Sequence, residues 1–146
     1  MGNQRQYNPQ GGFSEYLYVS LSEKVTINGV TGRLIAKADM IDKNDGNLPA
    51  YSNTSDVYFR QNLDRVVVQA KVYLSRNMVL DFDWSHMHTN KTSGESFPIG
   101  TIHVQTYRRK GDGEFIRLSN KARRMTEAEK EKYGPIIRYF NPNVIL

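Results

Sequence analysis

The 146-residue chain contains no cysteine, and it has only one tryptophan and three histidines. The absence of cysteine excludes disulfide bonds, thiolate metal sites and cysteine nucleophiles, and it is compatible with a reducing compartment. No apolar run approaches the roughly 20 residues that a membrane-spanning helix needs. The first twelve residues also lack the apolar core of a signal peptide. We therefore expect a soluble protein. Its location stays open, and both the cytoplasm and a virion are compatible with the sequence.

Recognisable catalytic motifs are also missing. The chain has no phosphate-binding glycine loop, no Ser-His-Asp set with supporting context and no membrane-binding amphipathic helix. Its length is that of a single domain with a core of its own. We expect one β-rich domain over residues 13–140, with an extended N-terminal arm over residues 1–12 and an exposed C-terminal tail over residues 141–146. Catalysis is not the leading hypothesis, and we expect a non-enzymatic protein.

Strand patterns fill most of the chain. Residues 15–21 alternate between apolar and polar, which predicts a half-buried strand, and Asn28-Gly29 between two apolar runs predicts a hairpin with a type I′ turn. Residues 42–56 are rich in turn formers and predict a loop. Further strands are expected over residues 99–107 and 115–118. The predicted fold is mainly β, a single antiparallel β-barrel or β-sandwich-like domain with one short C-terminal helix.

The helix is predicted by a capping box. Thr126 is followed three residues later by Glu129, so a short surface helix should span residues 127–133. Gly134 and Pro135 should end this helix, and residues 136–140 should then add a last strand.

The register of the central strand pair follows from keeping carboxylates off the apolar face. A three-residue loop over residues 76–78 satisfies this condition, with Asn77 or Met78 in the left-handed conformation. The loop would pair Leu74 with Leu80, Val72 with Phe82 and Ala70 with Trp84. On the outer face, Lys71 would then meet Asp83 and Tyr73 would meet Asp81.

Positive charge is concentrated in one segment. Residues 107–125 hold seven basic residues against Asp112 and Glu114, which accounts for the whole net charge of +5. Arginine and lysine neutralise phosphates without reading sequence, and aromatic side chains can stack on the bases of single strands. We therefore predict a nucleic-acid interface, favouring single-stranded DNA or RNA, formed by Tyr107, Arg108, Arg109, Lys110, Phe115, Arg117, Lys121, Arg123 and Arg124. The alternative is a solvated charged face or a surface for an acidic protein.

The two ends of the chain predict protein partners. Residues 1–12 and 141–146 have too little apolar surface to pack by themselves. The leading hypothesis is therefore a nucleic-acid-binding subunit of a larger nucleoprotein or virus-like assembly. A structural virion or appendage protein, whose arms clasp neighbouring subunits, is the alternative from another class.

A second alternative is carried by histidines. His86 and His88 share one face of a strand, as two ligands of one metal ion would require, and His103 on a neighbouring strand can approach them. A His-hydrophobic-His pattern followed by a tyrosine resembles that of rolling-circle and relaxase-type nucleases, in which a divalent metal ion assists attack by tyrosine on a phosphate. The candidate nucleophiles here are Tyr107 and Tyr133.

Aspartates form the last candidate group. Asp81 and Asp83, together with Asp39, Asp42 and Asp45, could bind a cation or act in acid-base chemistry. Cross-strand pairing explains Asp81 and Asp83 better, and residues 42–46 lack the flanking helices and the twelfth-position glutamate of an EF-hand.

Overall fold

The computed structural model describes residues 3–8, 12–38, 48–52, 54–91, 93–111, 113–119 and 121–146. The elements are β1 (Asn3–Asn8), β2 (Gly12–Ser20), β3 (Val25–Ile27), β4 (Val30–Lys37), β5 (Val57–Gln61), β6 (Val67–Leu74), β7 (Asn77–Asp83), β8 (His88–Thr89), β9 (Ser96–Phe97), β10 (His103–Arg109), β11 (Phe115–Arg117) and α1 (Glu127–Phe140). The prediction of a mainly β fold with a C-terminal helix is confirmed.

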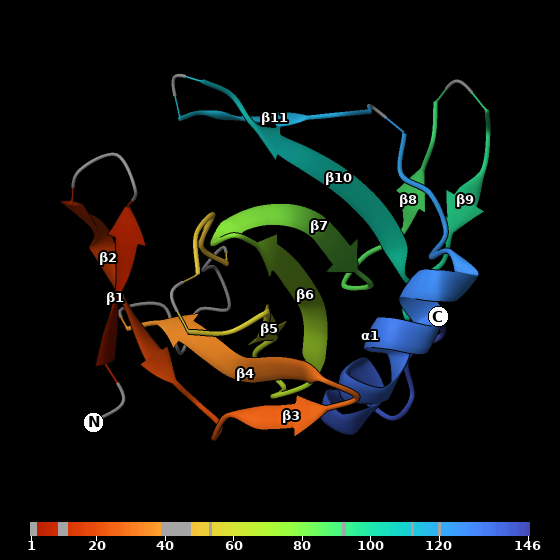
Figure 1. The fold of residues 1–146 in the computed structure, drawn as a ribbon. Coiled ribbons are helices and arrows are strands. Elements are labelled where there is room, and N and C mark those ends of the chain that lie inside the picture. Colours follow the sequence, from red (N-terminus) through yellow and green to blue (C-terminus); the bar gives the residue numbers. More distant parts are fainter. Residues whose placement is uncertain are drawn as a thin grey trace.

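Nine strands within the described ranges form one curved sheet (Figure 1). The strand order is β1-β2-β4-β5-β6-β7-β10-β11, and β3 pairs with β4 as a hairpin. Strands β4 and β5 run parallel, whereas the other pairs in this sheet are antiparallel. The described strands do not close into a barrel, because β1 and β11 lie at the two ends of this order.

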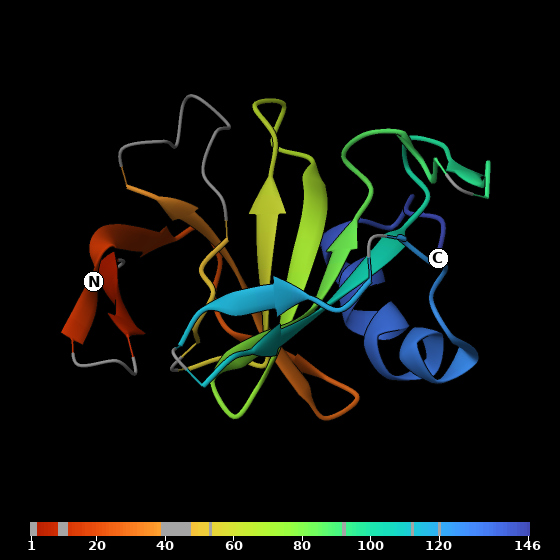
Figure 2. The same cartoon turned by 90° about the horizontal axis from the view of Figure 1, so that it is seen from above.

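The sheet buries apolar side chains on both faces. One cluster includes Phe59, Phe82 and Val104, and the helix α1 covers it at one side of the sheet (Figure 2). A second cluster includes Tyr58 and Tyr73 on the opposite face. The segment 48–52 covers part of this second face, since the Tyr73 hydroxyl donates to the carbonyl of Pro49 and Lys71 Nζ donates to the carbonyl of Leu48 at 3.3 Å.

The Asn28-Gly29 turn is confirmed, and the predicted register of the central pair is wrong. Asn28 and Gly29 both have positive φ values, as a type I′ turn requires. Between β6 and β7 the positive φ values fall on Ser75 and Arg76, at 48° and 71°, so the turn lies one residue before the predicted loop. Ala70 faces Phe82 and Leu74 faces Asn77 across the pair.

A β-bulge explains why the sequence argument failed. The register shifts between Val72 and Tyr73, which absorbs one extra residue on β7 and keeps Phe82 on the apolar face. Lys71 consequently lies opposite Asp81 rather than Asp83. Tyr73 does not meet Asp81 on an outer face, because it faces Met78 and both side chains are buried.

The C-terminal helix is twice as long as predicted. The capping box at Thr126 and Glu129 is present, but α1 continues through Pro135 to Phe140, so the predicted strand over residues 136–140 is wrong. An interior proline costs a helix about 3 kcal/mol. Complete burial of Ile136 and Ile137 against the sheet contributes about 1.5–3 kcal/mol for each side chain and outweighs that cost.

The C-terminal tail is not an exposed arm. Val144 is buried, and the backbone of Ile145 bonds to Gly100 and Ile102. Asn141 is also buried, and its Nδ2 donates to the Val67 carbonyl at 2.8 Å. The tail packs because its backbone bonds to residues 100 and 102 and its Asn141 side chain bonds to the distant Val67 carbonyl.

Within the predicted N-terminal arm, residues 3–8 form strand β1, which pairs with β2. Within the described ranges, no helix has both the length and the apolar character needed to cross a membrane.

Candidate nucleic-acid interface and histidine cluster

Strands β10 and β11 form a two-stranded ribbon that extends past the main sheet (Figure 1). Strand β10 pairs with β7 through residues 103–106, and it pairs with β11 through residues 107–109. Among the described strands, the basic half of β10 pairs with β11 alone, and β11 lies at one end of the strand order. The strands predicted over residues 99–107 and 115–118 correspond to β10 and β11, which pair with each other, and Asp112 lies outside the described residues.

Four basic side chains of the predicted interface are exposed: the fourth is Arg124, and the other three, Arg108, Arg117 and Lys121, lie on the ribbon or just after it. Arg108 lies on β10, Arg117 lies opposite Tyr107 on β11, and Lys121 follows the ribbon. Among the described residues, none of these three forms a salt bridge with a carboxylate. Arg109 is partly buried, and its Nε has no hydrogen-bond partner in the described part of the chain.

Other members of the predicted interface have structural roles. Both terminal nitrogens of Arg123 lie 2.8 Å from the carboxylate oxygens of Glu129, which fixes the start of α1. Arg124 lies over the ring of Phe97 and 3.5 Å from a carboxylate oxygen of Glu95. Lys110 closes the hairpin, since its backbone N–H donates to the carbonyl of Glu114.

The two predicted stacking residues lie against the second apolar cluster. Tyr107 and Phe115 are partly buried there, and Phe115 meets the ring of Tyr51 edge to face at 5.3 Å between centroids. Burial raises the pKa of the Tyr107 hydroxyl, the charge of Asp81 raises it further, and the hydrogen bond with Arg117 opposes both effects. These rings are less available to nucleic-acid bases than the sequence predicts.

All three histidines come together where β7 ends and β10 begins. Asp83 ends β7, and its carboxylate accepts from the N–H and hydroxyl of Ser85, at 2.8 and 2.6 Å. This turn leads into His86 and then into β8, which begins at His88. His103, the first residue of β10, lies opposite Asp83 in the sheet.

The rings of this cluster, defined as His86, His88 and His103, are in mutual contact. The ring of His103 stacks on that of His88 at 4.9 Å and meets that of His86 edge-on at 5.2 Å. One nitrogen from each ring lies within 4.8 Å of the other two. His103 is buried, His88 is partly buried and His86 is exposed. Burial lowers the pKa of His103 to about 4. The charge of Asp83 opposes this shift, whereas His88 and His86 lower the pKa further.

The two candidate tyrosine nucleophiles lie differently with respect to the histidine cluster. Tyr107 lies four residues along β10 from His103, on the same face of that strand. Tyr133 contacts Phe82 at 5.6 Å between ring centroids. Phe82 and Asp83 point to opposite faces of β7, so Tyr133 lies across the sheet from His103.

Of the five candidate aspartates, Asp39, Asp42 and Asp45 lie outside the described residues. Asp81 accepts a 2.8 Å hydrogen bond from Gln69 Nε2, and burial raises the pKa of its carboxyl while the charge of Lys71 opposes the shift. Asp81 and Asp83 thus support the sheet and the turn that follows it.

Sequence reasoning missed Asn90, a buried residue that joins the two candidate sites. Its side chain accepts from the Ala122 N–H at 3.1 Å and donates to the Ala122 carbonyl at 2.9 Å. Its Oδ1 also lies 3.2 Å from His88 Nε2. The sequence around Asn90 does not indicate this structural role, because its partner Ala122 lies 32 residues further along the chain.

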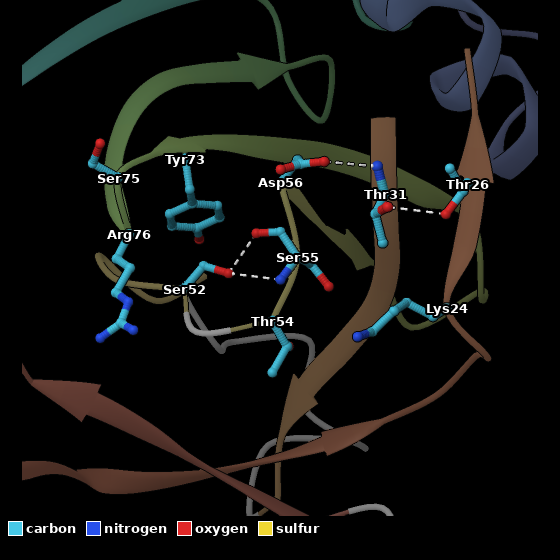
Figure 3. Close-up of a pocket in the computed structure, with 10 residues that line it drawn as sticks. All are labelled: Lys24, Thr26, Thr31, Ser52, Thr54, Ser55, Asp56, Tyr73, Ser75 and Arg76. Atoms are coloured by element: carbon cyan, nitrogen blue, oxygen red, sulfur yellow. Dashed lines mark hydrogen bonds between the residues drawn. The ribbon is translucent and has the colours of Figure 1, made fainter. Parts of the chain in front are cut away.

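A polar pocket of about 440 Å³ lies elsewhere, between the β3–β4 hairpin and the segment 52–56 (Figure 3). Asp56 accepts from the backbone N–H of Thr31 at 2.9 Å, and the hydroxyls of Thr26 and Thr31 are 2.9 Å apart. Lys24 and Arg76 bring positive charge to the lining, but none of the lining residues is a histidine. The pocket therefore offers no imidazole base.

Comparison with known proteins gives no relative from which a function could be transferred. No protein-family model, no curated protein and no solved structure matches the chain.

Proposed function

We propose that the protein binds nucleic acid through the backbone phosphates, using the β10–β11 ribbon as its contact surface. The observation that carries this proposal is the exposure of Arg108, Arg117 and Lys121 on or next to a projecting edge ribbon, without salt-bridge partners among the described residues. Phosphate neutralisation by such groups gives affinity that does not depend on base sequence.

The shape of the ribbon supports the proposal. A two-stranded β-ribbon fits the major groove of duplex DNA, where its side chains can reach phosphates on either side. Arg108 pairs with Ile116 and Arg117 pairs with Tyr107, so the two arginines point to opposite faces of the ribbon. Such an arrangement suits contact with two phosphate backbones.

The proposed interface is smaller than the sequence predicts. Arg123 is held by Glu129 and Arg124 lies near Glu95, so neither enters the interface. Partial burial of Tyr107 and Phe115 removes the argument that favoured single strands over duplexes.

Assembly into a larger particle stays a prediction. One of its two premises, an unpacked C-terminal arm, is removed by the packing of Asn141 and Val144. Light scattering of the full chain with and without an oligonucleotide tests whether copies associate. A defined oligomer in the absence of nucleic acid would support assembly.

The proposed function is tested by fluorescence anisotropy with labelled single-stranded DNA, single-stranded RNA and duplex DNA of random sequence. The variant R108Q/R117Q/K121Q removes the three exposed charges of the interface. The control K24Q/R65Q/K132Q also removes three exposed charges, but from other elements. Both variants have the same net charge, so a difference in their affinities shows that the position of the removed charges matters.

We expect binding by the unmodified chain and by the control, and weak binding by the ribbon variant. Equal loss in both variants would mean that affinity depends only on net charge and would overturn the interface. An absence of binding by the unmodified chain at low salt would overturn the function.

A further inference from the structure

We infer that His86, His88 and His103 form a binding site for a transition-metal ion of the Zn²⁺ class. Three chain segments contribute one imidazole each: the turn after β7, the start of β8 and the start of β10. One ring nitrogen of each lies within 4.8 Å of the other two. The inference concerns a site separate from the basic ribbon, and it does not depend on nucleic-acid binding.

A buried and unpaired nitrogen of His103 is the strongest evidence for a ligand at this cluster. This side chain is 2% exposed, yet its Nδ1 has no hydrogen-bond partner among the described residues. Buried polar atoms in proteins are nearly always paired, and an unpaired one calls for a specific reason. A metal ion beside the ring would take the lone pair of this nitrogen.

The other two rings already carry the outer contacts that metal-binding histidines need. His86 Nδ1 lies 3.0 Å from Ser85 Oγ and 3.7 Å from Asp83 Oδ1, and His88 Nε2 lies 3.2 Å from Asn90 Oδ1. If the metal ion is bound by the second nitrogen of each ring, Nε2 of His86 and Nδ1 of His88, these contacts orient the rings for it. Histidine ligands commonly bind a carboxylate, carbonyl or other polar group through the nitrogen that does not hold the ion.

Only a small closure is needed to complete the site. With bonds of about 2.0–2.1 Å, a tetrahedral ion holds its nitrogen ligands about 3.4 Å apart. The present limit of 4.8 Å therefore requires an inward movement of roughly an ångström by the rings. The exposed side chains of His86 and Met87 lie at the rim, where such a movement meets little packing.

The ligand chemistry selects the class of ion. Three imidazoles suit Zn²⁺, Cu²⁺ or Ni²⁺, whereas Ca²⁺ and Mg²⁺ take oxygen ligands. Three protein ligands leave a fourth position on a tetrahedral ion. Because His86 is exposed, solvent reaches one side of the cluster, from which water can fill this position.

The competing explanation is that these rings are stacked only as part of the packing. His103 also lies near Phe97, at 5.9 Å between ring centroids, as an apolar core residue would. Packing alone requires no metal affinity, so a titration with metal separates the two explanations.

The experiment is an isothermal titration of the untagged full chain with zinc chloride in the absence of nucleic acid. We expect one Zn²⁺ per chain. The variants His86→Ala and His88→Ala should each weaken binding by more than about tenfold, because loss of even an outer contact of a ligand costs about 10–100-fold in metal affinity. Met87→Ala is the matched control, since Met87 is exposed between the two ligands and should leave the affinity unchanged.

Titration with Co²⁺ provides a second measurement that does not depend on heat. We expect visible absorption bands from nitrogen-coordinated Co²⁺ in the unmodified chain and in the Met87→Ala control, and their loss in His86→Ala. No Zn²⁺ binding by the unmodified chain, or binding by both histidine variants as tight as that of the unmodified chain, would overturn the site. His103 is not substituted because its burial makes it important for folding.

Discussion

The side-chain amide of Asn28 donates a 3.1 Å hydrogen bond to the backbone carbonyl of Glu131, across 103 residues of sequence. This carbonyl is the one that would accept from residue 135 in a regular helix, and Pro135 has no N–H to donate. The turn of the β3–β4 hairpin therefore compensates for the proline and ties the hairpin to α1.

The first prediction concerns this bond. Asn28→Gly keeps the positive φ value of the turn but removes the donor, so it should lower the free energy of unfolding by about 0.5–1.5 kcal/mol. In a Pro135→Ala background the same change should cost less, because the alanine N–H can supply the missing bond. Urea unfolding of the four proteins in this cycle measures the difference. Equal costs in both backgrounds would show that the bond does not compensate for Pro135.

The second prediction is a pH dependence at the start of α1. Burial alone would raise the pKa of the Glu129 carboxyl, but hydrogen bonds from Arg123 and Thr126 outweigh burial and hold it below its ordinary value of 4.5. A carboxyl with a depressed folded pKa stabilises the fold above its unfolded pKa, and this contribution is lost as pH falls through the folded pKa. Glu129→Gln should therefore be more destabilising near neutral pH than in acid.

Urea unfolding of Glu129→Gln at about pH 7 and about pH 3 tests this sign. Thr126→Ala is the comparison, since it removes only the Thr126 side-chain hydrogen bond and leaves Arg123 on the Glu129 carboxylate. It should cost about 1 kcal/mol near neutral pH, and its cost should vary less with pH than that of Glu129→Gln. If Glu129→Gln costs the same at both pH values, the charge of Glu129 adds nothing to stability.

The third prediction compares two glycines. A Cβ on Gly32 would lie 2.9 Å from Ile136 Cδ1 and 3.0 Å from a ring carbon of Phe59, whereas one on Gly111 would meet nothing within 4 Å. Gly32→Ala should lower stability by about 1–3 kcal/mol through overpacking between β4 and α1. Gly111→Ala should change it by less than about 1 kcal/mol. Thermal unfolding of both variants measures the contrast, and similar transition temperatures would contradict the close packing of α1 on Gly32.

The fourth prediction concerns the salt dependence of nucleic-acid binding. Each phosphate contact contributes about −0.9 to the slope of log affinity against log salt for duplex DNA and about −0.7 for single strands. Loss of the contacts of Arg108, Arg117 and Lys121 should therefore make the slope shallower by roughly 2–3. Anisotropy titrations at several salt concentrations measure it. An unchanged slope in R108Q/R117Q/K121Q would show that these side chains do not contact phosphates.

Local signals in the sequence were reliable where a few neighbouring residues decide the backbone. Asn28-Gly29 predicted its turn because both residues tolerate positive φ, and Thr126 with Glu129 predicted the start of α1. The register between β6 and β7 was wrong because a bulge, which no local pattern marks, adds one residue to β7.

For the candidate sites, the sequence supplied the residue types and the structure decided which are available. The seven basic residues of segment 107–125 look equivalent in the sequence. Burial of Tyr107 and the bidentate contact of Arg123 with Glu129 depend on segments that the local pattern does not include. The sequence argument placed His86 and His88 on one face of a strand, but His86 lies in the bend between β7 and β8, outside both strands. The approach of His103 depends on the pairing of β10 with β7.

The sequence by itself determined that this chain is mainly β, that a capped helix begins near its end and that its excess charge lies in one segment, residues 107–125. These properties follow from local alternation, turn chemistry and composition, which act over a few residues. Only the tertiary structure decided that α1 continues through Pro135, that the C-terminal tail packs and that three histidines meet. Each of these depends on burial or strand pairing between segments far apart in the sequence. The energy of these long-range contacts outweighs the local preference for a helix end at Pro135, for an exposed C-terminal tail and for solvent-exposed histidine side chains.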